Sequence, residues 1–302
     1  MTLGSTKLRY TALTGYFQHD AQPTDRSFEA VSITPVPCLI DRGYETDKSF
    51  DPLGEKSSWE RFAHYLDHLN EAAGGKAVYK LLYAARHGQG YHNVETEQPT
   101  SSPAQSYWAK LDGDDKMTWA DAHLTHTGIG QAKAMNTFWE DAAVTTKLPL
   151  ARRHYVSPHA RCLETCELAF SNLTLPPGGG EVPAFKPLIK ELIRERLGIH
   201  TCDRRRTRTW IQENHPIFAI EEGFVEKDEL WKPDVRETLA EHAVRVKAFL
   251  DEVFASDDAP IISVTAHSGT IMALYEVIGH PAVRVAPGAI IPVLIKAEVV
   301  EG

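Results

Sequence analysis

Cysteine is scarce in this sequence: four of the 302 residues are Cys38, Cys162, Cys166 and Cys202. So few cysteines in a chain of this length exclude a fold held together by a disulfide framework, and reduced thiols fit an intracellular protein. Cys162 and Cys166 lie four positions apart near His159, but this spacing matches no zinc-ligand pattern. We therefore expect both to be small buried side chains.

Long apolar runs and positive charge are also lacking. No stretch approaches about 18 consecutive apolar residues, so we expect no transmembrane helix. The N-terminal MTLGSTKLRYTALTGYF lacks the charged start and apolar run of a secretory signal, and the C-terminal AEVVEG matches no lipidation or retention signal. The net charge of -9 disfavours nucleic acid and acidic membranes as partners. We expect a cytoplasmic protein that binds a small molecule, and the oligomeric state stays open.

The length and composition allow one large core. With 302 residues, 42% of them hydrophobic, a single domain over residues 1–302 is expected. Residues 1–57 show no strong periodicity, which indicates an irregular extension packed on that domain. Regular structure is expected over residues 78–297, interrupted by an insert at about 200–235.

Strand and helix patterns alternate through this core. Mostly apolar runs indicate buried strands, whereas helical spacing after Ser or Thr caps indicates helices. The expected strands are residues 78–85, 154–156, 185–193, 261–266 and 289–297, and the expected helices begin at Ser57 or Ser58, at Thr125 and at Ser157-Pro158, or span 235–254 and 270–278. The alternation predicts an α/β fold, a three-layer α/β/α sandwich around a mostly parallel sheet.

Polar side chains follow these strands at their carboxyl ends, where ligands bind in such sheets. Arg86-His87-Gly88 follows the first strand, with Asn93 a few residues later. Ser157-Pro158-His159-Ala160-Arg161 follows the second strand, and His267-Ser268-Gly269 follows the fourth. The third strand runs into Glu191, Arg194 and Glu195. We expect two histidines, two arginines and a carboxylate to converge on one pocket.

This set of side chains suits phosphoryl transfer. Neutral imidazole is a nucleophile near pH 7 without help from a metal, and a protonated carboxylic acid can deliver a proton to the leaving oxygen. Arginine holds phosphate oxygens in a bidentate fork. Gly88 allows the backbone to come close to a ligand. Arg161 lies in the first turn of a predicted helix, where free N–H groups also favour an anion.

In these motifs the sequence resembles the histidine phosphatase superfamily, whose fold is phosphoglycerate-mutase-like. The resemblance is carried by Arg86-His87-Gly88, by Leu124-Thr125-His126-Thr127-Gly128-Ile129-Gly130-Gln131-Ala132, by the segment from Ser157 to Arg161 and by the segment from His267 to Gly269, in that order over about residues 78–297. It implies that His87 carries the phosphoryl group and that no metal or organic cofactor takes part. His126 stands where Pro is usual, and His159 is atypical at its position.

The sequence is most similar to a branch of fungal phosphomutase-like proteins. Residues 86–93, together with residues 192–206, carry this closer resemblance. It implies that Glu195 is the proton donor and that His267 is a further catalytic group. The residues expected to hold the phosphate are Arg86, Arg161, His267, Asn93, Gly88 and Ser268.

Several alternatives stay open at this point. Glu191 is a rival to Glu195 as proton donor. The arginine run over residues 204–208 indicates either a solvated face paired with acids or part of a substrate funnel. Residues 194–198 read Arg-Glu-Arg-Leu-Gly, where mutases have Asn-Glu-Arg-His-Tyr-Gly, which favours a phosphomonoesterase over a mutase. A non-catalytic interaction module is disfavoured, because packing alone does not require the His–Arg–Arg–His set.

Overall fold

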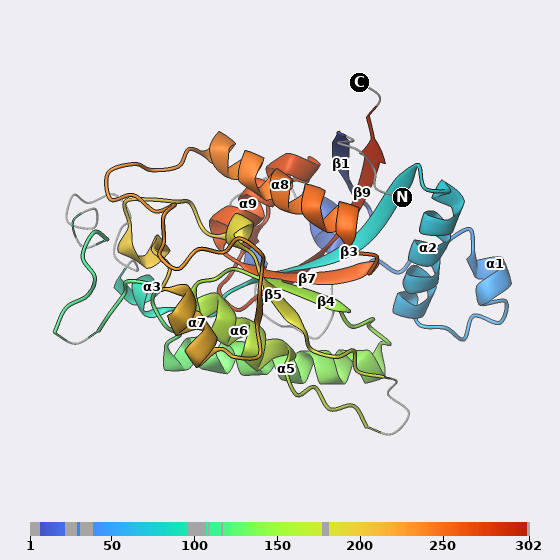
Figure 1. Ribbon diagram of the computed structural model, residues 1–302. Helices are drawn as coiled ribbons and strands as arrows, with labels where there is room; N and C mark the ends of the chain where they lie inside the picture. The colour runs from blue at the N-terminus through green and yellow to red at the C-terminus, as the bar shows by residue number, and fades with distance from the viewer. Residues whose placement is uncertain are drawn as a thin grey trace.

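The computed structural model describes residues 7–21, 29–30, 39–95, 107, 109–115, 117–176 and 181–300. Its central sheet has the strand order β1-β9-β3-β7-β4-β5-β6 (Figure 1). These strands are β1 (Leu8–Leu13), β9 (Ile290–Val299), β3 (Ala77–Arg86), β7 (Ile261–Ala266), β4 (Arg153–Val156), β5 (Pro187–Ile189) and β6 (Ala219–Ile220). From β3 to β6 the neighbours are parallel, whereas β9 runs antiparallel to both β3 and β1. The mostly parallel sheet agrees with the prediction.

Helices cover both faces of this sheet. The helices α8 (Leu239–Ser256) and α9 (Ser268–Ile278) lie on one face, and α5 (His126–Thr145) and α6 (Ala160–Phe170) lie on the other (Figure 1). The shorter or peripheral elements are α1 (Asp47–Phe50), α2 (Ser58–Ala73), α3 (Tyr91–Glu95), α7 (Arg208–Asn214), the 3-10 turns η1 (Gln18–Ala21), η2 (Glu191–Ile193) and η3 (Thr201–Asp203), and the two-stranded pair β2 (Glu29–Ala30) and β8 (Arg284–Val285).

The side chains of β3 show how the two cores are separated. Leu81 and Tyr83 pack in the core shared with α2, α5 and α6, whereas Leu82 and Ala84 pack in the core shared with α8 and α9. Successive residues of a strand point to opposite faces, so an apolar strand serves both cores at once. The expected three-layer sandwich is confirmed.

Local capping fixes the starts of several helices. The Ser57 hydroxyl accepts from the Glu60 N–H at 3.2 Å, and the Glu60 carboxylate accepts from the Ser57 N–H at 2.9 Å, so α2 begins with a capping box. The Thr125 hydroxyl accepts from the Gly128 N–H at 3.1 Å and begins α5. Both starts agree with the sequence.

Three expectations about the secondary structure are wrong. The helix α8 begins at Leu239 and not at residue 235, because Thr238 and Glu241 form its capping box. The third core strand is confined to Pro187–Ile189, since the 3-10 turn η2 follows directly. The N-terminal extension is not irregular throughout. Leu8–Leu13 forms the edge strand β1, which pairs with β9 over its whole length.

The start of α6 differs from the prediction in a way that matters for the site. Its N-cap is His159, whose side chain makes no capping bond, and the helix begins at Ala160. The Ala160 N–H donates instead to a carboxylate oxygen of Asp121 at 3.0 Å. A distant acid therefore caps this helix, and the Ser157 hydroxyl is left to serve the site.

No helix among the described residues combines the length and the apolar composition that crossing a membrane requires.

Candidate active site

His87 follows β3 at the carboxyl edge of the sheet and is almost fully buried. Its Nδ1 lies 2.7 Å from the carbonyl oxygen of Gly88. A carbonyl only accepts, so Nδ1 carries the ring proton and Nε2 carries the lone pair. Burial, together with the charges of Arg161 and Arg86, holds the pKa of His87 well below its ordinary value. The ring is therefore neutral at pH 7, with a free nucleophilic nitrogen.

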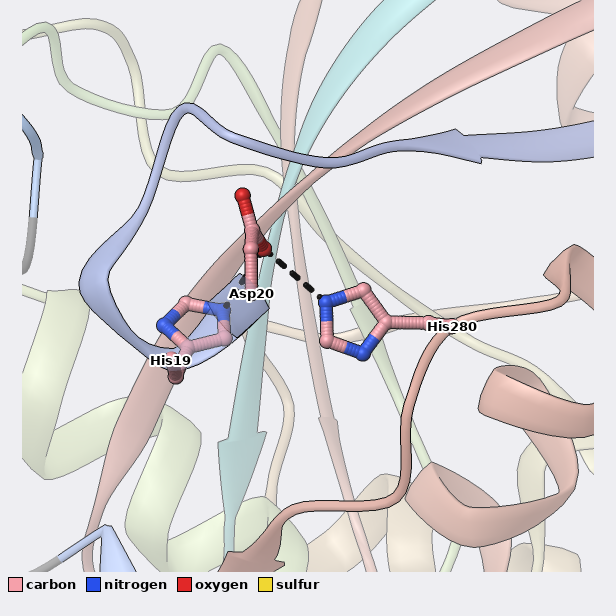
Figure 2. A group of neighbouring side chains, drawn as sticks. All are labelled: His19, Asp20 and His280. Atoms are coloured by element: carbon pink, nitrogen blue, oxygen red, sulfur yellow. Dashed lines mark hydrogen bonds and ion pairs between the residues drawn. The ribbon is translucent and has the colours of Figure 1, made fainter. Parts of the chain in front are cut away.

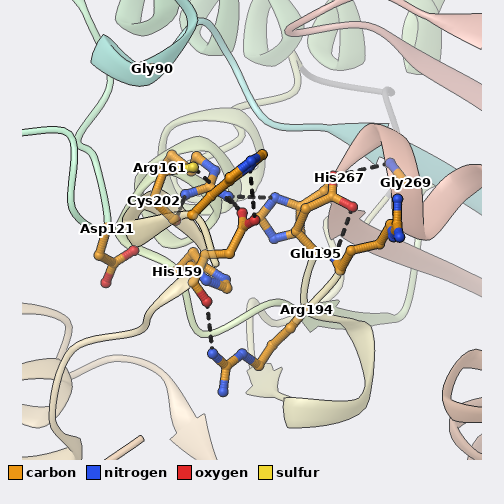
Figure 3. Close-up of polar contacts among 12 residues, drawn as sticks. Gly90, Asp121, His159, Arg161, Arg194, Glu195, Cys202, His267 and Gly269 are labelled. Carbon is orange, nitrogen blue, oxygen red and sulfur yellow. Dashed lines mark hydrogen bonds and ion pairs between the residues drawn. The ribbon is translucent and has the colours of Figure 1, made fainter. Parts of the chain in front are cut away.

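Arg161 lies in the first turn of α6 and is buried at the centre of the site (Figure 3). Its Nη1 donates to the Cys202 carbonyl at 2.7 Å, and its Nη2 lies 3.2 Å from Nδ1 of His267 and 3.5 Å from Oδ1 of Asp203. Its Nε is buried and makes no hydrogen bond within the described part of the chain. A buried cationic N–H without an acceptor costs free energy, so this donor indicates an anionic ligand.

His267 connects Arg161 to a second histidine. Because arginine only donates, Nδ1 of His267 accepts, and its Nε2–H donates to the Ser157 hydroxyl at 2.8 Å. The Ser157 hydroxyl then donates to Nδ1 of His159 at 3.1 Å. The rings of His87 and His267 lie 5.2 Å apart between centroids. This series of bonds fixes the tautomer and the orientation of His267.

Sequence reasoning missed the role of Ser157 because a Ser-Pro pair before a helix is a typical capping signal. It also noted His159 as a departure from the family pattern. Both side chains are buried beside His267. Thr165 was missed as well. Its hydroxyl accepts from the Gly88 N–H at 3.0 Å and positions the backbone next to His87.

The remaining expected phosphate-binding residues lie next to His87 in the chain or in the helices α3 and α9. Arg86 donates through Nη1 to the Val285 carbonyl at 2.9 Å, and its charge acts on His87. Asn93 lies in α3, where its side-chain oxygen accepts from the Gly90 N–H at 3.0 Å. Ser268 is the first residue of α9, directly after His267.

Gly88 must lack a side chain. A Cβ on this residue would lie 2.6 Å from the backbone oxygen of Gly128, at the start of α5. The loop after β3 and the first turn of α5 therefore approach more closely than any larger residue allows.

The carboxylate of Glu195 rests on the first turn of α9 (Figure 3). One oxygen accepts from the Gly269 N–H at 3.1 Å, and the other accepts from the Arg196 N–H at 2.9 Å. A Cβ on Gly269 would lie 1.9 Å from Oε1 of Glu195, so only glycine leaves room for the carboxylate. Since Gly269 is two residues from His267, this packing places Glu195 beside the histidines.

Glu191, the rival carboxylate, has other partners. It pairs with Arg194 at 2.9 Å and also with Arg205. Arg194 is fully buried and pairs with Asp228 at 2.5 Å. Glu191 and Arg194 therefore belong to an ion-pair network that anchors the insert, and Glu195 is the carboxylate that the structure brings next to His267.

The arginine run after residue 203 is paired with acids. Arg204 lies 2.8 Å from Asp112, and Arg206 lies 3.9 Å from Asp121. Arg205 is buried in its pair with Glu191. These three arginines therefore have acidic neighbours, as in the first interpretation of the run, but Arg205 is buried and does not belong to a solvated face.

Two groups of described residues each bring three possible metal ligands together. One is His200, Cys202 and Asp203, and the other is His19, Asp20 and His280. Asp203 is paired with Arg161 and with Arg236 at 2.7 Å, which leaves that carboxylate neutralised by cations rather than open to a metal. Cys162 and Cys166 belong to neither group and are buried, as expected.

Comparisons with known proteins show which family this chain is similar to. A family model described as "Histidine phosphatase superfamily (branch 1)" matches residues 104–285, a segment that contains Arg161, Glu195 and His267 but begins after His87. The "Probable phosphoglycerate mutase" of Arthroderma benhamiae is 41% identical over 292 residues, which cover 96% of this chain and 85% of that protein. "Phosphomutase-like protein 3" of Candida albicans is 36% identical over 72% of this chain and 66% of its own length. A "Probable phosphoglycerate mutase" of Saccharomyces cerevisiae is 33% identical over 73% of this chain and 80% of that protein.

The contact between Gly269 and Glu195 gives a first prediction. In Gly269→Ala the new methyl group displaces the carboxylate, and a shift of about 1 Å in a catalytic group costs about 100-fold in rate. We expect kcat for hydrolysis of para-nitrophenyl phosphate to fall by about that factor, with an unchanged thermal unfolding midpoint. Gly130→Ala is the matched control, because a Cβ there meets nothing within 4 Å. Wild-type kcat in Gly269→Ala would show that Glu195 takes no part.

Proposed function

Because the chain belongs to the histidine phosphatase superfamily, we propose that it is a metal-independent phosphomonoesterase that hydrolyses a small phosphorylated metabolite through a phosphohistidine on His87. The observation that carries the proposal is the pairing of a neutral, buried His87 with the open Nε donor of Arg161. A nucleophile and an anion-binding cation meet at the carboxyl edge of the sheet, as phosphoryl transfer requires.

In the first step Nε2 of His87 attacks phosphorus in line with the ester oxygen. The N–P bond forms as the P–O bond to the leaving group breaks. Glu195, protonated at this stage, gives its proton to the leaving oxygen and becomes a carboxylate. The hydrogen bond from Nδ1 to the Gly88 carbonyl stabilises the positive charge that develops on the ring.

In the second step a water molecule attacks the phosphohistidine. Glu195, now a base, takes a proton from that water as its oxygen bonds to phosphorus and the N–P bond breaks. Phosphate leaves, His87 is again neutral, and Glu195 is again protonated. The N–H groups of Arg196 and Gly269 hold the carboxylate in place through both proton transfers.

The phosphate oxygens are held by cations and by backbone. Arg161 offers Nε, and Arg86 supplies a second positive charge next to His87. Asn93 in α3, Gly88 in the loop after β3 and Ser268 at the start of α9 complete the set. His267 binds an oxygen through its Nε2–H, which exchanges its present bond to Ser157 for one to phosphate. The local positive charge lets a protein of net charge -9 hold an anion.

A mutase is the second candidate, because two of the fungal relatives carry the name of phosphoglycerate mutase. It shares the first step and then passes the phosphoryl group to a second acceptor. The segment Arg194-Glu195-Arg196-Leu197-Gly198 departs from the mutase pattern and favours hydrolysis.

The cytoplasmic location of the protein also stays a prediction.

The activity is tested with para-nitrophenyl phosphate at 25 °C in excess chelator. We expect turnover in the wild type and a loss of about 10⁴-fold or more in His87→Ala, because the nucleophile is removed. His68→Ala is the control, since His68 lies on the surface beside Glu45.

Full activity in His87→Ala would overturn the mechanism. Phosphate transfer to added 3-phosphoglycerate, with little free phosphate, would favour the mutase instead. No turnover and no binding of vanadate would indicate a non-catalytic module.

The protonation state of His87 gives a separate prediction. Its depressed pKa means that it stays neutral as pH falls through 6.5. His123 is the internal control, because its hydrogen bond to Glu164 raises its pKa, so that it becomes charged above pH 6.5. Nitrogen-15 NMR of the histidine side chains, assigned with His87→Gln and His123→Gln, should show the two rings titrating on opposite sides of that pH. An imidazolium at His87 above pH 6.5 would contradict the account.

A further inference from the structure

A second cluster of buried polar groups lies away from the active site. It consists of His19 and Asp20 in η1, and of His280, which follows the last turn of α9 (Figure 2). Their exposed fractions are 1%, 7% and 7%. The two imidazole rings lie on either side of the carboxylate. The His19–Asp20–His280 cluster is thus a buried set of two imidazoles and one carboxylate.

The spacing of the facing atoms resembles that of metal ligands. Oδ1 of Asp20 lies 3.0 Å from Nε2 of His280 and 3.8 Å from Nε2 of His19. In a tetrahedral zinc site with bonds of about 2.0–2.1 Å, neighbouring ligand atoms lie about 3.3 Å apart. The two measured distances lie on either side of that value.

Further hydrogen bonds orient the side chains of Asp20 and His280. The other carboxylate oxygen of Asp20 accepts from the N–H groups of Tyr16 at 2.9 Å and Phe17 at 2.8 Å, which leaves Oδ1 for another partner. Nδ1 of His280 lies 2.7 Å from the Pro281 carbonyl, so this nitrogen carries a proton. A histidine whose far nitrogen donates to a backbone carbonyl is the usual arrangement around a protein-bound metal.

Hydrogen bonds within the cluster do not give each of its buried polar atoms a partner. A proton shared between Asp20 and His280 would satisfy their 3.0 Å contact. It would leave His19, which has the Pro292 carbonyl as an acceptor for one buried ring nitrogen but no donor for the lone pair of the other among the described residues. A cation placed between the three atoms would accept the lone pairs of both imidazoles and a carboxylate oxygen together. Tyr275, whose ring stacks on His280 at 5.0 Å, adds a buried hydroxyl that also has no hydrogen-bond partner among those residues.

We infer that the His19–Asp20–His280 cluster is a structural Zn²⁺ site, with Nε2 of each histidine and Oδ1 of Asp20 as ligands and a water molecule in the fourth position. Two imidazoles and a carboxylate whose facing atoms all lie within 4.8 Å of one another suit zinc. The buried hydroxyl of Tyr275 is the group available to bind that water.

The site connects a segment near the N-terminus to a segment near the C-terminus. Asp20 and His280 are 260 residues apart, so the metal closes nearly the whole chain into one loop, and clips that close long loops restrict the unfolded state most. It also anchors the segment after β1 to the end of α9. The length of α9 places the cluster about 15 Å from His267, too far for the ion to contact the phosphate. The ion therefore stabilises the fold and takes no part in the chemical step.

The test uses the full chain produced without an affinity tag. After purification and dialysis with Zn²⁺, mass spectrometry of metals should find about one zinc per wild-type chain and none in Asp20→Asn or His280→Gln. His68→Gln is the matched control, because it removes a surface histidine that also faces a carboxylate, and it should keep the zinc. Chelation should lower the wild-type thermal midpoint by about 5 °C and leave that of Asp20→Asn unchanged.

Co²⁺ titration keeps the inference testable if the variants do not fold. Wild-type protein freed of metal should develop the visible absorption of tetrahedral Co²⁺ with one equivalent, and Zn²⁺ should abolish it. Wild type that retains no zinc and gives no such spectrum would overturn the site and leave a hydrogen-bonded triad. Equal zinc in wild type and His280→Gln would also overturn it, as adventitious binding. The rate of phosphate-ester hydrolysis at 25 °C is measured separately, because neither the zinc content nor the Co²⁺ spectrum depends on it.

Discussion

One buried cation organises the active site. Arg161 is enclosed between α6 and η3, where the Cys202 carbonyl and Asp203 hold its guanidinium. Its charge is the leading electrostatic cause, after burial, of the depressed pKa values of His87, His92, His159 and His267. Arg161 therefore adds to burial in keeping the proposed nucleophile His87 neutral, and its open Nε is the donor that we propose for the phosphate. The electrostatic character of the site therefore depends on one buried guanidinium, whose Nε–H has no acceptor among the described residues.

The insert after β5 supports that arginine. Asp203 binds both Arg161 and Arg236, and the neighbouring Arg194 is held by Asp228 and Glu191. Removing one partner of such a buried network leaves an uncompensated charge, which is strongly destabilising. The segment that the sequence marks as an insert is therefore part of the scaffold of the candidate active site. Its ion pairs hold Glu195 over Gly269, while the backbone carbonyl of Glu195 is bound by Arg245.

The sequence predicted those features that depend on residues close together in the chain. Strand ends carrying Arg86-His87 and His267, and the helix caps at Ser57 and Thr125, depend on neighbours within a few residues, and the structure has them as expected. Ser157 was misplaced because its capping preference loses to a tertiary bond with His267. The choice between Glu191 and Glu195 depends on contacts with Arg205 and Gly269, far along the chain. The His19–Asp20–His280 cluster has no local pattern, since its members meet only through the fold.

The central claim is that His87 carries the phosphoryl group, and trapping that group tests it most directly. Protein mixed with a turning-over phosphate ester and quenched in alkali, which preserves phosphohistidine, can be digested and mapped by mass spectrometry. The account predicts phosphate on the peptide that contains His87 and none after His87→Ala. Turnover without a labelled histidine, or a label on a different residue, would contradict it.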